Sequence, residues 1–356
     1  MADNDIRIDA ELLETFTKNI FTQVGMPPED AAMEAKVLVW ANLRGVDSHG
    51  VLRLPAYLDN IESGTMNPNP NIRILKESAA VLYMDADRAL GPIATVQAMD
   101  RVIDKARETG IGWCLIRNIT HQGAMAYYAQ MAAQQDMVGI AVVCSPPNMA
   151  PFGARAAGVH NSPIAIAVPA DRHNPLSLDM ATSVAAGGKL TLAADKRVPL
   201  GPDWALDAEG NPTTDPLAAR ILCPSGGPKG SGLALMFQCL TSQMANNPLI
   251  VPALRKETED NQESRKARHN QNSFVAALDI SFFTEIDTYK SQIDDLIDEL
   301  KALPRADGFD DILMPGEPEF NTLEERSENG IPLPPGTVEK LRESAERTQV
   351  ALPEGL

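Results

Sequence analysis

The sequence lacks the features that mark several classes of protein. Its four cysteines lie far apart and form no CxxC pair, which is typical of reduced thiols rather than disulfides or a zinc site. The longest apolar run, residues 137–144, is too short to cross a bilayer. The polar, acidic start at residues 1–8 does not read as a secretory signal. These absences predict a soluble, cytoplasmic protein with no membrane association.

Positive charge is also scarce, because 31 Lys and Arg residues stand against 48 Asp and Glu residues, for a net charge of −17. A field of this sign repels phosphate backbones, and no basic run is interleaved with aromatic residues. Nucleic-acid binding is therefore not expected. The same field disfavours anionic ligands, so a site for one would need its own Arg or Lys side chains.

The common phosphate-binding and metal-binding motifs are missing. No G-x-G-x-x-G follows a predicted strand, and no G-x-x-x-x-G-K-[ST] is present. No two histidines stand three or four residues apart, so no metal site is predicted and a metal-dependent hydrolase is disfavoured. A nucleotide, if one binds, must use other segments.

A chain of 356 residues is long enough for two domains. Short apolar stretches alternate with helical patterns through its middle, which predicts an α/β domain of roughly 200 residues flanked by helical segments from both ends. Residues 46–70 and the charge-rich residues 255–272 are predicted loops. The predicted strands are 79–84, 111–116, 138–144, 164–168, 176–179 and 274–280, and the predicted helices are 10–23, 27–45, 93–106, 123–135, 230–244 and 284–300.

The segment 44–53 carries the first candidate chemistry. His49 titrates near neutral pH and can pass a proton to an oxygen as hydride arrives at carbon. Its neighbour Ser48 can hydrogen-bond within such a site, and Arg53 can pair with a substrate carboxylate. A loop histidine that only stabilises a turn remains an alternative.

A second candidate, His121, follows Thr120 where a predicted strand ends and a helix begins. Free backbone N–H groups at such a point face any bound anion. Thr120 is also a good helix N-cap, and that role alone would explain it. His121 could orient a substrate or a phosphate.

Two further segments complete the set. Residues 224–232 place glycines and Lys229 at the start of a predicted helix, where backbone and ammonium could hold a phosphate, although such glycines are also common in loops. Asp179 lies in an apolar strand and needs a partner there. A histidine would serve, as would backbone N–H groups.

Together these segments resemble the malate/L-lactate dehydrogenases that lack a Rossmann fold. That family also contains ureidoglycolate dehydrogenase, 2,3-diketogulonate reductase, sulfolactate dehydrogenase and piperideine-2-carboxylate reductase. The matching stretches keep their order along nearly the whole chain. They are 45–50 (GVDSHG), Thr120-His121 with Tyr127-Tyr128, 161–169 (NSPIAIAVP), 178–183 (LDMATS), 226–233 (GGPKGSGL) and 312–317 (ILMPGE).

The resemblance implies a homodimer with a mixed, largely antiparallel sheet as its cofactor domain, at residues 76–280. A helical domain would combine residues 1–75 with 281–356. It implies His49 as proton donor in a relay with Ser48 and Asp179, or else His121 as the acid/base. Arg53 would hold the substrate carboxylate. The residues implied around an NAD or NADP cofactor are Thr120, His121, Asp171, Lys229, Gly230, Pro315, Gly316 and Glu317.

The sequence thus predicts a nicotinamide-dependent oxidoreductase of a small 2-oxo or 2-hydroxy acid. A reductase of cyclic or N-alkyl imino acids is the alternative within enzymes, because the same residues can serve hydride transfer to C=N. A nucleotide-binding or assembly protein without turnover is the alternative from another class. Asp171 favours NAD because a carboxylate repels a 2′-phosphate, whereas the adjacent Arg172 could pair with one.

Overall fold

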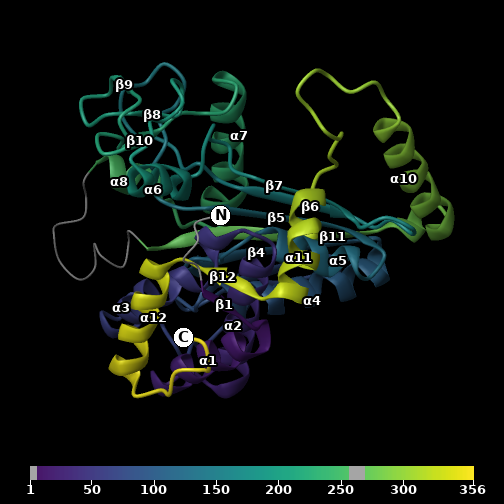
Figure 1. The fold of residues 1–356 in the computed structure, drawn as a ribbon. Coiled ribbons are helices and arrows are strands. Elements are labelled where there is room, and N and C mark those ends of the chain that lie inside the picture. Colours follow the sequence, from purple (N-terminus) through teal and green to yellow (C-terminus); the bar gives the residue numbers. More distant parts are fainter. Residues whose placement is uncertain (1–5, 256–268) are drawn as a thin grey trace.

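The computed structural model describes residues 6–255 and 269–356, which form helices around one large sheet (Figure 1). The helices are α1 (Ala10–Gln23), α2 (Pro28–Leu43), α3 (Leu54–Glu62), α4 (Gly91–Thr109), α5 (Ala126–Ala133), α6 (Gly187–Lys196), α7 (Pro228–Gln238), α8 (Ile250–Leu254), α10 (Ile286–Lys301), α11 (Glu317–Asn329) and α12 (Pro335–Thr348). The strands are β1 (Ile6–Ile8), β2 (Arg73–Glu77), β3 (Val81–Asp85), β4 (Ile111–Ile119), β5 (Met137–Cys144), β6 (Ile164–Val168), β7 (Leu176–Met180), β8 (Ala205–Leu206), β9 (Pro212–Thr213), β10 (Ile221–Leu222), β11 (Gln271–Asp279) and β12 (Ile331–Leu333).

The large sheet has seven strands in the order β2-β3-β4-β11-β5-β6-β7. Only the β3–β4 pair is parallel, and every other neighbouring pair runs antiparallel. Strand β11 lies in the middle, with Val275 opposite Cys114 of β4 and opposite Ala141 of β5. The predicted mixed, largely antiparallel sheet is confirmed.

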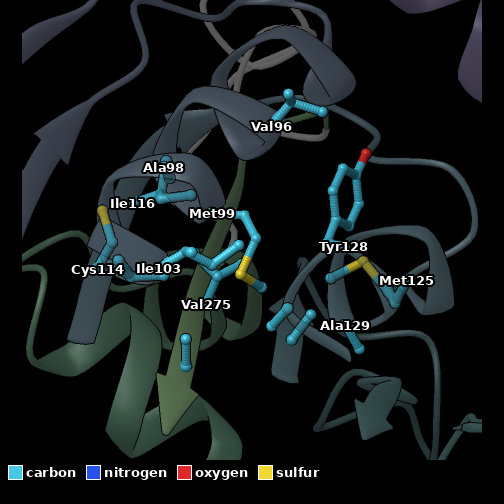
Figure 2. Packing of buried hydrophobic residues seen from close by; sticks show 14 of the residues in the cluster. Val96, Ala98, Met99, Ile103, Cys114, Ile116, Met125, Tyr128, Ala129 and Val275 are labelled. Carbon is cyan, nitrogen blue, oxygen red and sulfur yellow. The ribbon is translucent and has the colours of Figure 1, made fainter. Parts of the chain in front are cut away.

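Helices α4 and α5 cover one face of this sheet and form the largest core with it. Figure 2 shows Met99 and Ile103 of α4 reaching toward Ile116 and Val275 of the sheet. Each fully buried side chain of this size contributes about 1.5–3 kcal/mol to folding. The sheet is thereby a rigid base for the loops at its edges.

A second core joins the two ends of the chain. Strands β1 and β12 pair antiparallel, with Ile8 opposite Ile331, and both side chains are buried. Helices α1, α2, α3 and α12 pack around this ribbon, as Figure 1 shows for the yellow α12 beside the purple N-terminal helices. The predicted helical domain built from both termini is thus present.

Helix α10 lies apart from these helices, at the right-hand end of the sheet in Figure 1. Its Asp294 binds the loop that follows β6, and its Lys290 forms an ion pair with Asp136 after α5 at 3.2 Å. Helix α10 was assigned to the predicted helical domain, yet it contacts segments of the predicted cofactor domain. The division of the chain at residues 75 and 281 therefore stays a prediction.

Several elements differ from the predicted ones. The predicted loop 46–70 contains helix α3, and the helix expected at 230–244 is α7 followed by a π-helical turn at Cys239–Gln243. Much of the predicted loop 255–272 lies outside the described residues. Within residues 6–255 and 269–356, no helix has both the length and the apolar character needed to cross a bilayer.

Candidate active site

The loop after α2 carries the first candidate segment, as two short 3-10 turns, Asp47–His49 and Val51–Arg53. The Asp47 carboxylate accepts hydrogen bonds from Nη1 and Nη2 of Arg326 in α11, at 2.7 and 3.1 Å. It also accepts the Asn42 side-chain amide at 2.7 Å. A bidentate pair fixes position and orientation together. Asp47 therefore anchors this loop to the C-terminal part of the chain.

His49 is held by the residue before it. Ser48 Oγ lies 2.9 Å from His49 Nδ1, which leaves Nε2 for other contacts. Helix α6 packs against Ser48, because a Cβ built on Gly188 would lie 2.8 Å from Ser48 Cβ. Burial, together with the smaller effect of the positive charge of Arg53, lowers the pKa of His49 to about 4. The imidazole is therefore neutral at pH 7.

His121 lies beside His49. The two rings stack with their centroids 5.4 Å apart and 20° between their planes. The Gly123 N–H donates to His121 Nδ1 at 3.3 Å, and the Tyr57 hydroxyl lies 2.6 Å from the same nitrogen. Because a backbone N–H can only donate, Nδ1 is an acceptor and the ring proton belongs on Nε2. Burial, followed by the nearby His49, lowers the pKa of His121 well below its usual value.

The backbone at His121 is positioned by the start of α4. Gly91 N–H donates to the His121 carbonyl oxygen at 3.1 Å. A Cβ on Gly91 would lie 2.3 Å from that oxygen and 2.4 Å from Gln122 Cα. Only glycine allows this approach without moving the loop.

Arg53 lies on the same loop as His49. Its Nε donates to the Ser48 carbonyl oxygen at 2.6 Å, which ties the guanidinium to the backbone beside the catalytic candidates. Its charge lowers the pKa of both His49 and His121. In the part of the chain that the structure describes, its two terminal nitrogens have no recorded protein partner, so they are available to an anion.

Two residues of this group, Tyr57 and His160, were not among those predicted from the sequence. Tyr57 is buried, and burial raises the pKa of its hydroxyl, which therefore stays protonated. His160 adds to the lowering of the pKa of His121, and burial lowers its own pKa to about 3. Tyr57 stands four residues after Arg53, one helical turn, a spacing that would have pointed to it had α3 been predicted.

Asp179 in β7 makes a different contact from the predicted relay. Its Oδ2 accepts the backbone N–H of Ala126, the first residue of α5, at 2.8 Å. The residue has exposed surface, but the surrounding protein desolvates its carboxylate and raises the pKa of Asp179 to about 6, and the negative charge of Glu319 adds to the rise. Among the described residues no hydrogen bond joins it to His49. Ser48 Oγ does lie within hydrogen-bond distance of His49, at 2.9 Å, and a relay among the three residues stays a prediction.

The residues implied around a cofactor are spread over several loops. The Thr120 hydroxyl is buried and donates to the Ala89 carbonyl oxygen at 2.7 Å, and α5 begins only at Ala126, so Thr120 is not a helix N-cap. Lys229 is exposed at the start of α7. Gly230 is buried, and its N–H donates to the Ser225 carbonyl oxygen at 2.8 Å. The Lys229 ammonium, rather than the Gly230 amide, is therefore the group available to a ligand here.

The turn at Pro315, Gly316 and Glu317 borders a cavity of about 120 Å³ between α10, α11 and the start of β7. The Pro315 carbonyl oxygen accepts the Ser177 N–H at 2.9 Å, and Glu317 forms an ion pair with Lys301 at 2.7 Å. Glu317 and Lys301 both line this cavity, whereas His49 and His121 do not. The turn is thus fixed to the sheet edge, apart from the histidine pair.

Comparison with known proteins places the chain in a family. A family model described as malate/L-lactate dehydrogenase matches residues 8–342. The malate dehydrogenase of Pyrococcus horikoshii is 36% identical, over 98% of this chain and 97% of that protein. The solved structure of the malate dehydrogenase from this organism aligns with 99% of this chain over 98% of its own chain, with a TM-score of 0.87.

Two further relatives carry other substrate names. The L-sulfolactate dehydrogenase of Methanocaldococcus jannaschii is 38% identical over 87% of this chain and 86% of that protein. A ureidoglycolate dehydrogenase (NAD(+)) of Escherichia coli O157:H7 is 31% identical over 88% of both. The resemblance inferred from the motifs is confirmed. The chain belongs to the malate/L-lactate dehydrogenase family and is an oxidoreductase acting on CH–OH groups.

Proposed function

We propose that this chain is an NAD-dependent dehydrogenase that interconverts a small 2-oxo acid and its 2-hydroxy acid, of the malate, lactate or ureidoglycolate type. The observation that carries the proposal is the pair of neutral, stacked imidazoles beside the Arg53 guanidinium. A carboxylate paired with Arg53 would bring the adjacent carbon, which bears the reacting oxygen, next to both rings. The family membership supports the reaction class.

His49 is the acid/base in this proposal. With Nδ1–H donating to Ser48 Oγ, its Nε2 is unprotonated and can accept the proton of a substrate hydroxyl during oxidation. The same nitrogen returns the proton during reduction. Because the pKa of His49 is low in the free protein, the negative charge of a bound substrate is needed to stabilise the protonated ring.

His121 has the complementary role. Its Nδ1 accepts the Gly123 N–H, so Nε2–H is free to donate a hydrogen bond to the same substrate oxygen. Such a donor polarises a carbonyl and stabilises the charge that develops on its oxygen. Two neutral rings can thus divide donor and acceptor work between them.

The residues present fit a nicotinamide dinucleotide. Lys229 offers an exposed ammonium at the positive end of α7, which suits a pyrophosphate. Asp171 offers an exposed carboxylate that can accept hydrogen bonds from ribose hydroxyls and that repels a 2′-phosphate. When bound, the cofactor supplies or accepts the hydride at the substrate carbon. The NAD(+) in the name of the ureidoglycolate relative supports NAD over NADP for this chain.

A substrate panel tests the proposal. NADH and NADPH oxidation is followed with pyruvate, oxaloacetate, oxalurate, diketogulonate, sulfopyruvate and piperideine-2-carboxylate. We expect turnover of NADH with at least one 2-oxo acid. Turnover of piperideine-2-carboxylate alone would replace the proposal with an imino acid reductase. Cofactor binding with no turnover of a suitably broad panel would argue for a binding protein.

We further propose that the enzyme works in the cytoplasm as a homodimer. Large apolar side chains are exposed along α7 and the π-helical turn after it, and a second copy could cover them. They are Leu233, Leu235, Met236, Leu240 and Met244. Light scattering after size-exclusion chromatography should give twice the chain mass. A monomer would contradict this, and Met236→Lys should weaken a dimer formed through this face.

A further inference from the structure

Helix α10 binds the backbone of the loop between β6 and β7. The Asp294 carboxylate is buried and accepts three consecutive backbone N–H groups. These come from Asp171 at 3.3 Å, Arg172 at 2.9 Å and His173 at 3.3 Å. Three charge-assisted hydrogen bonds to one carboxylate fix the path of this loop.

Carboxylates of α10 also bind two side chains of this loop, those of Arg172 and His173. Arg172 Nη2 lies 2.9 Å from Asp298 and 3.7 Å from Asp295, and Arg172 Nε lies 3.5 Å from Asp294. His173 Nε2 lies 2.8 Å from Asp298. The two residues of this loop that could carry positive charge are therefore both directed at α10.

Asp171 is in the opposite situation. Its side chain is exposed, and within the described residues no hydrogen bond or ion pair is recorded for its carboxylate. The loop thus presents one free anion to a ligand, while the Arg172 and His173 side chains already bind carboxylates of α10. A ribose diol can donate to the free carboxylate. A 2′-phosphate would have to displace Asp295 and Asp298 from Arg172 and would meet their negative charge.

We infer that Asp295 and Asp298 of α10 determine cofactor choice by withholding Arg172 and His173 from a 2′-phosphate. This inference rests on the proposed function, in which Asp171 faces the adenosine ribose. Of these three carboxylates, Asp294 is the one that accepts the backbone N–H groups of the loop, in addition to its 3.5 Å contact with Arg172 Nε. The selectivity carboxylates and the structural carboxylate can therefore be separated by mutation.

The test is a binding measurement on Asp295→Asn/Asp298→Asn. Cofactor fluorescence and calorimetry give the Kd of NADH and of NADPH without substrate. Exposed ion pairs are individually weak, so we expect the Kd of NADPH to fall by about three- to tenfold. The Kd of NADH should stay within about twofold, because Asp171 and the Asp294 contacts are unchanged. An unchanged Kd of NADPH would overturn the inference.

Two controls separate this account from a general charge effect. Asp287→Asn/Glu299→Gln removes the same charge from exposed positions of α10 that have no recorded contact with the loop, and it should leave both Kd values unchanged. Adding Arg172→Ala to the first variant should abolish most of the gain. An equal gain in the control, or a gain that survives Arg172→Ala, would overturn the inference. If the wild type binds neither cofactor, the proposed function fails and the inference with it. Normal NADH binding with no shift in the variant overturns the inference alone.

Discussion

The rings of His49 and His121 stack 5.4 Å apart, although their segments belong to different parts of the fold. His49 comes from the loop after α2 in the helical unit, and His121 follows the C-terminal end of β4 in the large sheet. Two imidazolium ions at this separation would repel each other, and burial disfavours charge on either ring. The arrangement therefore favours one proton transfer group beside one neutral hydrogen-bond donor.

This geometry predicts a specific pH dependence. For oxidation of the hydroxy acid, kcat/KM requires neutral His49 and should fall only as the pH drops toward about 4. For reduction, kcat/KM requires the protonated ring and should decline as the pH rises above that value. Initial rates in both directions across pH 4–9 check this. An inflection near 6.5 in the oxidation profile would show an ordinary, unperturbed histidine.

Tyr57→Phe tests the orientation of His121. The hydroxyl lies 2.6 Å from His121 Nδ1, and a hydrogen bond of this kind contributes about 0.5–1.5 kcal/mol. We expect a loss of about 1 kcal/mol in the free energy of unfolding. We also expect kcat to fall, by less than for removal of the ring, because Gly123 N–H still holds Nδ1. Tyr127→Phe is the matched control and should leave kcat unchanged. Unchanged kcat in Tyr57→Phe would make its hydroxyl irrelevant to turnover.

Arg53→Lys tests recognition of the substrate carboxylate. Arg53 binds the Ser48 carbonyl oxygen through Nε and keeps two further nitrogens for a ligand. Lysine has one nitrogen and cannot make both sets of contacts. KM for carboxylate substrates should rise while the Kd of NADH stays constant. An equal loss for a substrate analogue without the carboxylate would assign Arg53 a structural role.

Gly91→Ala tests how the His121 loop is held. The new Cβ would lie 2.3 Å from the His121 carbonyl oxygen, so the loop must shift. Overpacking of this kind costs about 1–3 kcal/mol of stability. Turnover should fall as well, because His121 moves. Gly336→Ala meets no atom within 4 Å and serves as the control in thermal unfolding. Equal stability of the two variants would contradict the tight contact.

Local sequence features predicted many elements but not their pairing. Helix α1 was found within its observed bounds, and Asp9 caps it by accepting the N–H groups of Glu11 and Leu12 at 2.9 and 3.1 Å. The apolar run of β6 was found within its observed bounds. Strand β11, however, pairs with β4 and β5, far away in the sequence, and periodicity carries no information on such partners. Helix α3 was missed because the stretch around it contains several Asn, Gly and Pro residues, which are typical of loops.

The contacts of the candidate active site were also not predictable from local sequence features. The polar setting of His49 and His121 singled out both residues, but their stacking depends on how two units of the fold meet. Asp179 could have bound a histidine or backbone N–H groups, and the structure has it on Ala126 N–H. Asp47 stood in the same motif as His49, yet its partner Arg326 lies near the other end of the chain. The spacing of residues in a motif cannot show contacts between residues so far apart in the sequence.

His49 is the acid/base in the proposed mechanism, and single-turnover kinetics of His49→Ala test that role most directly. Hydride transfer is followed by cofactor absorbance with saturating NADH and the best 2-oxo acid of the panel. We predict a rate about 10²–10⁴-fold below that of the wild type, with the Kd of NADH unchanged. His121→Ala should lose less, since it removes a hydrogen-bond donor rather than the proton transfer group. A near-normal rate in His49→Ala, with a collapse in His121→Ala, would contradict the account and assign the proton transfer to His121.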